Sequence, residues 1–214
     1  MALRDEYLDE VLRLEGRGFF GRATHCPTCG VGVPEYRCLD CLGGQLFCKT
    51  CVLDMHARLP LHRLQVGAAW KRMRCDAAER QYQIWSGTYF KRTSLREAGF
   101  VLRPSHLKGE QCITAAPAVD LVVLHLNGMH TVAAEFCKCG GSSRRTQLLR
   151  LGWWPATPFD PRTCATMAVL RHFHLLNLQG KVTAYDYYRA LHLGTDNSGL
   201  QTLPVSRCCV DVTI

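Results

Sequence analysis

Cys26 to His62 reads CPTCGVGVPEYRCLDCLGGQLFCKTCVLDMHARLPLH, a stretch of 37 residues that contains six cysteines, two histidines and four glycines. The cysteines form three Cys-x2-Cys pairs, and a histidine pair follows them: Cys26 and Cys29, Cys38 and Cys41, Cys48 and Cys51, then His56 and His62. A Cys-x2-Cys pair lets two thiolates approach one ion from a tight turn, and tetrahedral zinc requires four such donors. The stretch is too polar and rich in turn residues to form an apolar core unaided. Eight donors therefore predict two closed zinc sites rather than ordinary buried thiols.

The eight donors allow two pairings, consecutive or interleaved. We favour the interleaved pairing because two ions would then join the loop ends across the module. It assigns Cys26, Cys29, Cys48 and Cys51 to site 1, and Cys38, Cys41, His56 and His62 to site 2. This cross-brace resembles the B-box and related zinc-binding folds, with short strands at 39–40 and 46–47 and a helix at 49–58. Both sites are full, which indicates a structural role, since a catalytic zinc keeps an open position.

A second, less regular cluster lies downstream and comprises His106, Cys112, Cys137 and Cys139. These residues predict a third zinc site that clips a hairpin to the segment before it, with His130 as a substitute ligand. The alternative is that these cysteines only pack as small apolar side chains.

Composition places the chain among globular proteins. It has 214 residues, 26 basic and 18 acidic side chains, a formal net charge of +8 and 13 cysteines. The charged start and the lack of a long apolar run predict an intracellular protein without a membrane span. Thirteen cysteines in a reducing compartment favour metal binding over a disulfide framework. The positive charge permits contact with polyanions but does not establish it.

The remaining patterns predict an α+β fold, with a small antiparallel sheet followed by C-terminal helices. Apolar periodicity predicts a helix at 5–15, and Asn127-Gly128 predicts a type I′ hairpin at 119–136. That turn would place Leu126 opposite Met129, His125 opposite His130 and Val123 opposite Val132. A third strand is expected at 146–153. A helix from Asp160-Pro161 to Gly180 and another from Thr183 to about Leu193 complete the fold.

These elements predict five regions along the chain. They are a lead-in helix and loop at 1–25, the double-zinc B-box-like module at 26–66, a basic insertion or linker at 67–83, an α+β domain at 84–198 and an irregular tail at 199–214.

Sequence signatures of common catalytic sites are missing. The chain has no His-x-Glu element of a zinc deaminase, no phosphate-binding loop and no dinucleotide-binding glycine motif. We therefore expect no enzyme activity and no small-molecule substrate.

An ordered series of short motifs resembles one family. Its members here include Arg13 to Gly16, Tyr36 to Cys41, Cys48 to Cys51, His106 to Cys112, Asn127 to His130, Phe136 to Cys139, Trp153 to Thr157 and Tyr185 to Tyr188. Over roughly residues 10–197 the chain is similar to the cysteine-cluster domain of KDZ (Kyakuja-Dileera-Zisupton) transposases, elements abundant in mushroom-forming fungi. Residues 66–83 look like an insertion relative to that domain.

The resemblance implies a zinc-binding accessory region of a mobile-element protein, nuclear, and engaged with DNA or with transposase subunits. The family continues into a catalytic domain with an acidic triad, and residues 200–214 do not resemble that continuation. We therefore expect a non-catalytic module.

Two kinds of partner remain open at this stage. For DNA, the candidate phosphate contacts are Lys71, Arg72, Arg74, Lys91, Arg92 and Arg96. The alternative is a B-box-like protein-interaction scaffold, which needs no basic surface. Basic residues that converge on one face would favour DNA, and an exposed apolar patch would favour a protein partner.

Overall fold

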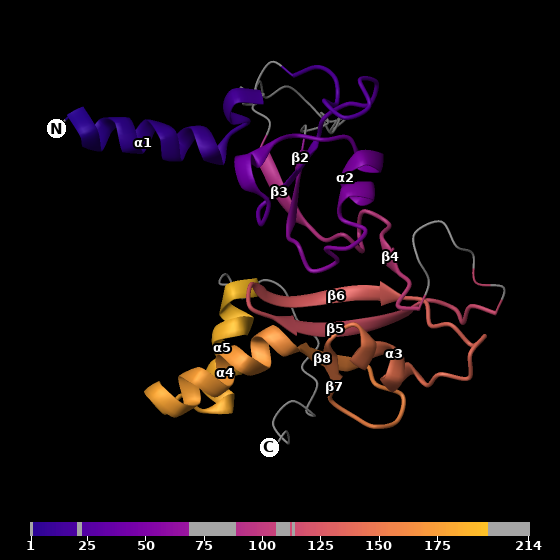
Figure 1. Cartoon of the computed structure of the whole chain (residues 1–214). Coiled ribbons are helices and arrows are strands. Elements are labelled where there is room, and N and C mark those ends of the chain that lie inside the picture. Colours follow the sequence, from indigo (N-terminus) through magenta and orange to yellow (C-terminus); the bar gives the residue numbers. More distant parts are fainter. Residues whose placement is uncertain (1, 21–22, 69–88, 106–111, 113, 197–214) are drawn as a thin grey trace, which may run out of the picture. The chain divides into compact units, whose positions relative to one another are not determined.

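The computed structural model describes residues 2–20, 23–68, 89–105, 112 and 114–196. The chain divides into two compact units, Met1–Ala98 and Gly99–Ile214, and each is described by itself below (Figure 1). Both helices and strands occur, so the predicted α+β class is confirmed. In the part of the chain that the structure describes, no helix has the length and apolar character to cross a membrane.

The first unit is built on a small antiparallel sheet with the order β1-β2-β3. Its elements are α1 (Ala2–Glu15), η1 (Gly18–Phe20), β1 (Tyr36–Cys38), η2 (Leu42–Gly44), α2 (Lys49–Met55), β2 (Leu64–Ala68) and β3 (Tyr89–Thr93). The expected strand at 39–40 is wrong, because the strand ends at Cys38 and the next residues turn. Phe47 forms only an isolated bridge with Tyr36. The aliphatic core of this unit is small and includes Leu46, Val52, Leu61 and Leu64.

The boundary between the units differs from the expected one, in which the α+β domain began at residue 84 after a linker at 67–83. Strand β3, which the sequence pattern placed in the second domain, pairs along its whole length with β2. It therefore completes the sheet of the first unit, and the division falls between Ala98 and Gly99.

The lead-in helix is present as α1, slightly longer than predicted. Arg37 of β1 holds its C-terminal end. The guanidinium donates hydrogen bonds to the carbonyl oxygens of Leu14, Glu15 and Gly16 at 2.7, 3.1 and 2.7 Å, and it stacks 3.8 Å from the centre of the Phe90 ring. A cation at this end satisfies carbonyls that the helix leaves without partners.

The second unit contains a five-stranded sheet with the order β4-β6-β5-β8-β7. Its elements are β4 (Val101–Leu102), β5 (Val119–His125), β6 (Gly128–Ala134), α3 (Arg144–Arg150), β7 (Trp153–Pro155), β8 (Thr163–Thr166), α4 (Met167–Gly180) and α5 (Ala184–Thr195). The β4·β6 and β5·β8 pairs are parallel. The sheet is therefore mixed, which corrects the purely antiparallel expectation.

The hairpin is present, but its predicted register is wrong by two residues. A shift of two keeps each side chain on its predicted face of the sheet. His125 pairs with Gly128, and Val123 pairs with His130. Gly128, not the expected Asn-Gly dipeptide, supplies the positive φ, at 131°. A Cβ on Gly128 would lie 2.7 Å from Oγ1 of Thr195, and the next backbone N–H donates to that oxygen at 2.7 Å. The distant end of α5 therefore determines how the turn closes.

Two further predictions are also wrong, one in the type of element and one in where a helix begins. The expected strand at 146–153 is helix α3 for its first part, because the Ser143 side chain accepts the backbone N–H of Thr146 and caps a helix. The helix expected from Asp160 begins at Met167, with Thr166 as its N-cap. The intervening residues of β8 are held in the sheet between β5 and β7.

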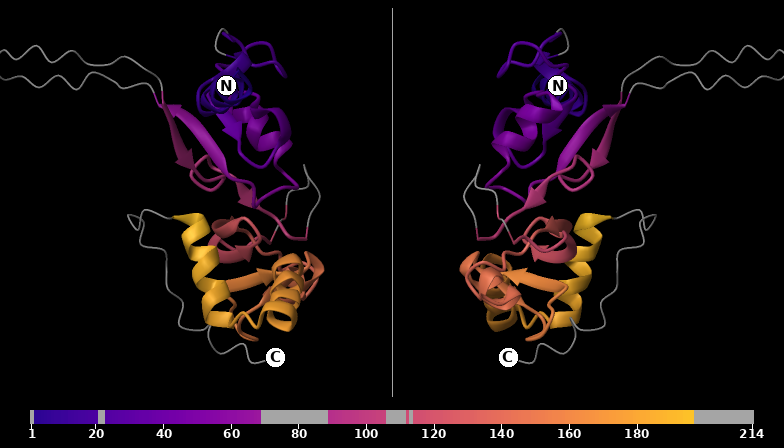
Figure 2. Two further views of the ribbon diagram at one scale, coloured as in Figure 1. Left: turned by 90° about the vertical axis from the view of Figure 1, so that its left-hand side faces the viewer. Right: turned by 90° about the vertical axis from the view of Figure 1, so that its right-hand side faces the viewer.

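Both faces of the second sheet contribute to a core. Leu121, Val123, Val132 and Ala134 are buried on one face. On the other face, Met129 packs with Val169 of α4 and Leu191 of α5, and the two helices cover it (Figure 2). Helix α5 begins at the predicted capping residue, since the Thr183 hydroxyl accepts the backbone N–H of Asp186. This unit thus has an apolar core of its own.

Candidate metal centres

The first cysteine tetrad consists of Cys26, Cys29, Cys48 and Cys51, whose sulfur atoms lie within 4.8 Å of one another. The first two come from a turn closed by hydrogen bonds from Cys26 N–H to the Gly32 carbonyl at 2.7 Å and from Gly30 N–H to the Cys26 carbonyl at 2.8 Å. The last two come from the start of α2, where Cys48 is the N-cap residue. These four residues are those of the interleaved site 1.

Gly32 lets the turn approach the start of α2. A Cβ at this position would lie 2.5 Å from Cβ and 2.8 Å from Sγ of Cys48. The backbone N–H of Gly32 also donates to Sγ of Cys29 at 3.4 Å. The glycine therefore does two things for the tetrad: it leaves room for one thiol and donates a hydrogen bond to another.

The second tetrad consists of Cys38, Cys41, His56 and His62, again within 4.8 Å. Nδ1 of His62 lies 3.4 Å from the sulfur of Cys38 and 3.4 Å from that of Cys41, and Nε2 of His56 lies 3.5 Å from the Cys41 sulfur. These residues are those of the interleaved site 2. The helix predicted to carry His56 ends at Met55, and His56 is its C-cap residue.

The ring of His56 is held in the tautomer that metal ligation needs. Its Nδ1 lies 2.7 Å from the carbonyl oxygen of Val52, which can only accept a hydrogen bond. Nδ1 therefore carries the proton and Nε2, which faces Cys41, keeps its lone pair. Such a hydrogen bond to the second ring nitrogen is the usual way in which a protein orients a ligating histidine.

An ion pair fixes the loops of the second tetrad to each other. Asp40, between the two cysteines, accepts hydrogen bonds from the Arg63 backbone at 2.6 Å and from its guanidinium at 2.7 Å. Arg63 directly follows His62 in the chain. Sequence reasoning missed this pair, although its acidic residue lies within a Cys-x2-Cys pair and its basic residue follows a histidine ligand.

The pKa values of several tetrad thiols differ from that of a free cysteine. Burial raises the pKa of Cys26, but hydrogen bonds from backbone N–H groups outweigh burial and lower it to about 6. The hydrogen bond with Cys48 raises the pKa of Cys51 to about 12, and burial raises the pKa of Cys38 to about 12. Crowded thiols cannot all ionise without a cation between them, so a metal ion would displace protons from these sites.

The third cluster brings together Cys112, Cys137 and Cys139. The sulfur of Cys112 lies 3.4 Å from that of Cys137 and 3.3 Å from that of Cys139. The fourth predicted ligand, His106, lies outside the described residues. The proposed substitute, His130, lies at the hairpin turn, where its Nε2 is 2.7 Å from Oδ1 of Asn127; it is not among the three clustered residues.

Gln147 of α3 organises the loop of the third cluster and was not singled out from the sequence. Its side chain is 1% exposed. Oε1 accepts hydrogen bonds from Cys137 N–H at 3.1 Å and the Ser105 hydroxyl at 2.8 Å. Nε2 donates to the carbonyls of Cys137 at 2.8 Å and Ser142 at 3.0 Å. A glutamine in a helix carries no sequence signal for such a role.

Half of the predicted phosphate-binding residues lie outside the described chain: Lys71, Arg72 and Arg74. The other three, Lys91, Arg92 and Arg96, are exposed. Lys91 and Arg92 are adjacent in β3, at the edge of the first sheet, so their side chains leave opposite faces of the strand. These two residues do not converge on one face.

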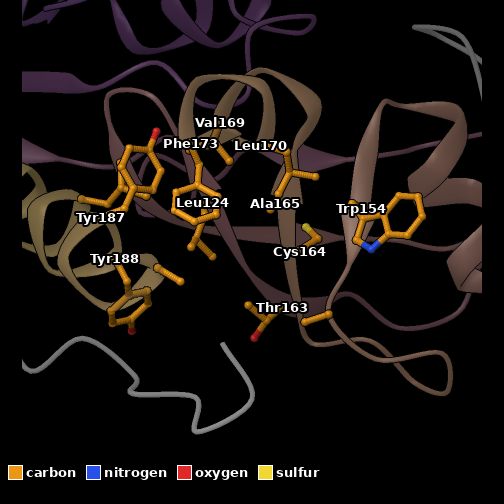
Figure 3. A pocket seen from close by; sticks show the side chains of 13 residues that line it. Leu124, Trp154, Thr163, Cys164, Ala165, Val169, Leu170, Phe173, Tyr187 and Tyr188 are labelled. Carbon is orange, nitrogen blue, oxygen red and sulfur yellow. The ribbon is translucent and has the colours of Figure 1, made fainter. Parts of the chain in front are cut away.

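The second unit also contains an apolar cavity of about 90 Å³. Figure 3 shows Leu124, Ala165, Phe173 and Tyr187 around it, with Trp154 to one side. The thiol of Cys164 faces this cavity, but it is 1% exposed, and burial raises its pKa to about 12. A protonated, buried thiol of this kind is a poor nucleophile.

A family model matches part of the chain. It is the CxC2-like cysteine cluster associated with KDZ transposases, and the match covers residues 95–199. No curated protein and no solved structure matches the chain. The matched segment contains the whole third cluster, the five-stranded sheet and the helices packed on it. Residues 95–199 are therefore similar to the CxC2-like cysteine cluster associated with KDZ transposases, and the two tetrads of the first unit lie upstream of the matched segment.

Proposed function

We propose that this chain is a zinc-stabilised, non-catalytic accessory module of a transposase-derived protein of fungal type, acting on DNA in the nucleus. The single observation that carries the structural part is the pair of complete four-donor groups in the first unit. The family match supports the link to transposases.

Zinc is the metal that the donors favour. One group offers four sulfur atoms, and the other offers two sulfur and two imidazole nitrogen atoms. Thiolate and imidazole ligands in a closed tetrahedral group are typical of structural zinc. The interleaved order of the two groups supports the comparison with the B-box cross-brace. The third cluster adds three sulfur donors and would take a further zinc ion with a fourth ligand.

The same geometry supports a role without catalysis. Four protein donors in each tetrad leave no position for a substrate or an activated water. Cys164, the thiol in the apolar cavity, is protonated at neutral pH because its pKa is about 12.

The zinc part of the proposal is tested by mass spectrometry of the native protein. We expect at least two zinc ions per chain, falling to at most one when Cys26 and Cys38 are both replaced by serine. A native mass without bound metal after purification in zinc-containing buffer would overturn it.

DNA is supported as the partner by the net charge of +8 and by the exposed Lys91, Arg92 and Arg96. A fluorescent duplex should bind at low ionic strength and dissociate steeply as salt rises, because bound cations are released from the phosphates. Each of the single variants Lys91→Glu, Arg92→Glu and Arg96→Glu should weaken binding, whereas Arg145→Glu, which makes the same charge change at an exposed residue of α3, serves as the charge-matched control. Binding that is absent at low salt, or that ignores salt, would contradict the DNA role.

A protein-interaction scaffold is the second candidate, and two observations favour it. Lys91 and Arg92 leave opposite faces of β3, and α1 exposes a stripe of apolar side chains. Exposed apolar patches of this kind mark protein interfaces. Zinc content and stability would be unchanged under this alternative, but duplex binding would fail.

A further inference from the structure

Helix α1 is amphipathic, yet its apolar side is exposed. Leu8 and Val11 in its centre are 55% and 52% exposed, and Tyr7, Leu12 and Leu14 beside them are exposed as well. The helix has only 14 residues, a length at which isolated helices are marginal in water. Its C-terminal end is anchored by Arg37, but its apolar side makes no comparable contact within the described residues.

The two charges that interrupt the apolar side lie at opposite ends of it. Arg4, Leu8, Val11 and Glu15 follow one another at spacings of four, three and four residues, which is the spacing of a coiled-coil seam. Two apolar residues thus occupy the centre of the seam, a cation lies at its beginning and an anion at its end.

We propose that α1 pairs in antiparallel orientation with α1 of a second copy of this chain. Opposite directions place Leu8 of each copy against Val11 of the other. The same register brings Arg4 of each copy next to Glu15 of the other, so both ends of the seam gain an ion pair. The interface is isologous, as a two-fold dimer requires.

Charge complementarity favours an antiparallel second copy of this chain over a parallel copy, nucleic acid or a membrane surface. A parallel pair would place Arg4 against Arg4 and Glu15 against Glu15. The polar side of the helix carries four acidic residues, Asp5, Glu6, Asp9 and Glu10, and one basic residue, Arg13, which pairs with Glu10. This net negative side would repel both nucleic acid and an anionic membrane surface. The antiparallel register satisfies each seam charge with the opposite charge of the same sequence.

The anchor at the end of the helix leaves this surface available. Arg37 contacts the carbonyl oxygens of Leu14, Glu15 and Gly16, whereas Glu15 as a residue remains exposed. The side chain of Arg4 is 81% exposed and lies 3.5 Å from Asp5, an ion pair weak enough to rearrange.

Sedimentation equilibrium of the zinc-loaded full chain, from about 1 µM to about 1 mM, tests the proposal. We expect a reversible monomer–dimer equilibrium within this range. Leu8→Asp should keep the chain monomeric throughout. A wild-type chain that stays monomeric up to the highest concentration, or a Leu8→Asp variant that still dimerises, would overturn the proposal.

Charge reversal tests the register without weakening the helix. Arg4→Glu and Glu15→Arg each place a like-charge pair at both ends of the dimer, and each should weaken it about tenfold. Both changes suit the helix dipole, since they put an anion near its N-terminus and a cation near its C-terminus. The double variant should recover wild-type dimerisation, and a mixture of the two single variants should form heterodimers. Failure of the double variant to recover would contradict the antiparallel register.

Discussion

The two halves of the molecule use cysteine differently. In the first unit eight sulfur and imidazole donors form two complete groups, and few aliphatic side chains are buried. In the second unit three sulfur donors lie outside the strands, two of them just after the end of β6, and the five-stranded sheet of this unit has apolar side chains packed on it. Metal ions are therefore expected to supply the folding free energy of the first unit, whereas in the second they would only fix a loop to an already stable sheet.

The largest expected effect comes from removing one metal ligand from each unit and comparing the stability of the two variants. Cys38→Ser should unfold the first unit, because a structural zinc contributes on the order of 10 kcal/mol to modules of this kind. Cys112→Ser should leave the sheet of the second unit folded. Near-ultraviolet circular dichroism and backbone NMR of the two variants provide the measurement. Equal stability of Cys38→Ser and the parent protein would refute the contrast.

A glycine substitution probes how closely the first tetrad is packed. Gly32→Ala introduces a Cβ 2.5 Å from that of Cys48, and we expect a loss of about 1–3 kcal/mol in the free energy of unfolding. The matched control is Gly140→Ala beside the third cluster, where a Cβ would meet nothing within 4 Å. Thermal unfolding in excess zinc compares the two. Similar melting temperatures would show that the turn relaxes at no cost.

The third cluster can be weakened without touching a ligand. Gln147→Leu removes the four hydrogen bonds that this buried side chain makes, two of which go to the Cys137 backbone. Metal affinity of this cluster should fall about 10–100-fold, while the two tetrads keep their metal. Arg145→Ala on the exposed side of the same helix is the control. Competition with a zinc-binding dye measures both, and an unchanged affinity for Gln147→Leu would argue against the organising role.

The smallest effect concerns thiol reactivity in the second unit. In the metal-free chain, Cys139 is exposed, and hydrogen bonds from Cys137 lower its pKa to about 7, so an alkylating reagent should modify it early at neutral pH. Cys164, buried and with a pKa of about 12, should react only after unfolding. Mass spectrometry of tryptic peptides against time gives the order of labelling. Early modification of Cys164 would mean that its cavity opens in the native state.

Local patterns predicted much of this molecule. The ligand groups of the first unit follow from cysteine spacing, and the start of α5 follows from Thr183 and its partner three residues later. In both cases the residues on which the prediction rests lie close together in the chain, so a single segment of sequence is enough to predict the structure.

The errors arose where distant residues decide the local structure. The hairpin register depends on Thr195, which contacts Gly128 from 67 residues away. Residues 163–166 look like the first turns of a helix, but pairing with β5 makes them a strand. The role of Gln147 could not be predicted, because its partners Ser105 and Cys137 come from other segments that only the tertiary structure brings next to α3.

The most direct test of the central claim is hydrogen exchange of the zinc-loaded chain before and after a strong chelator is added. We predict that backbone protection disappears over 26–68 and 89–93 and persists over 119–134 and 163–195. Protection that survives in the first unit after complete metal removal would contradict the claim that bound metal holds this unit together.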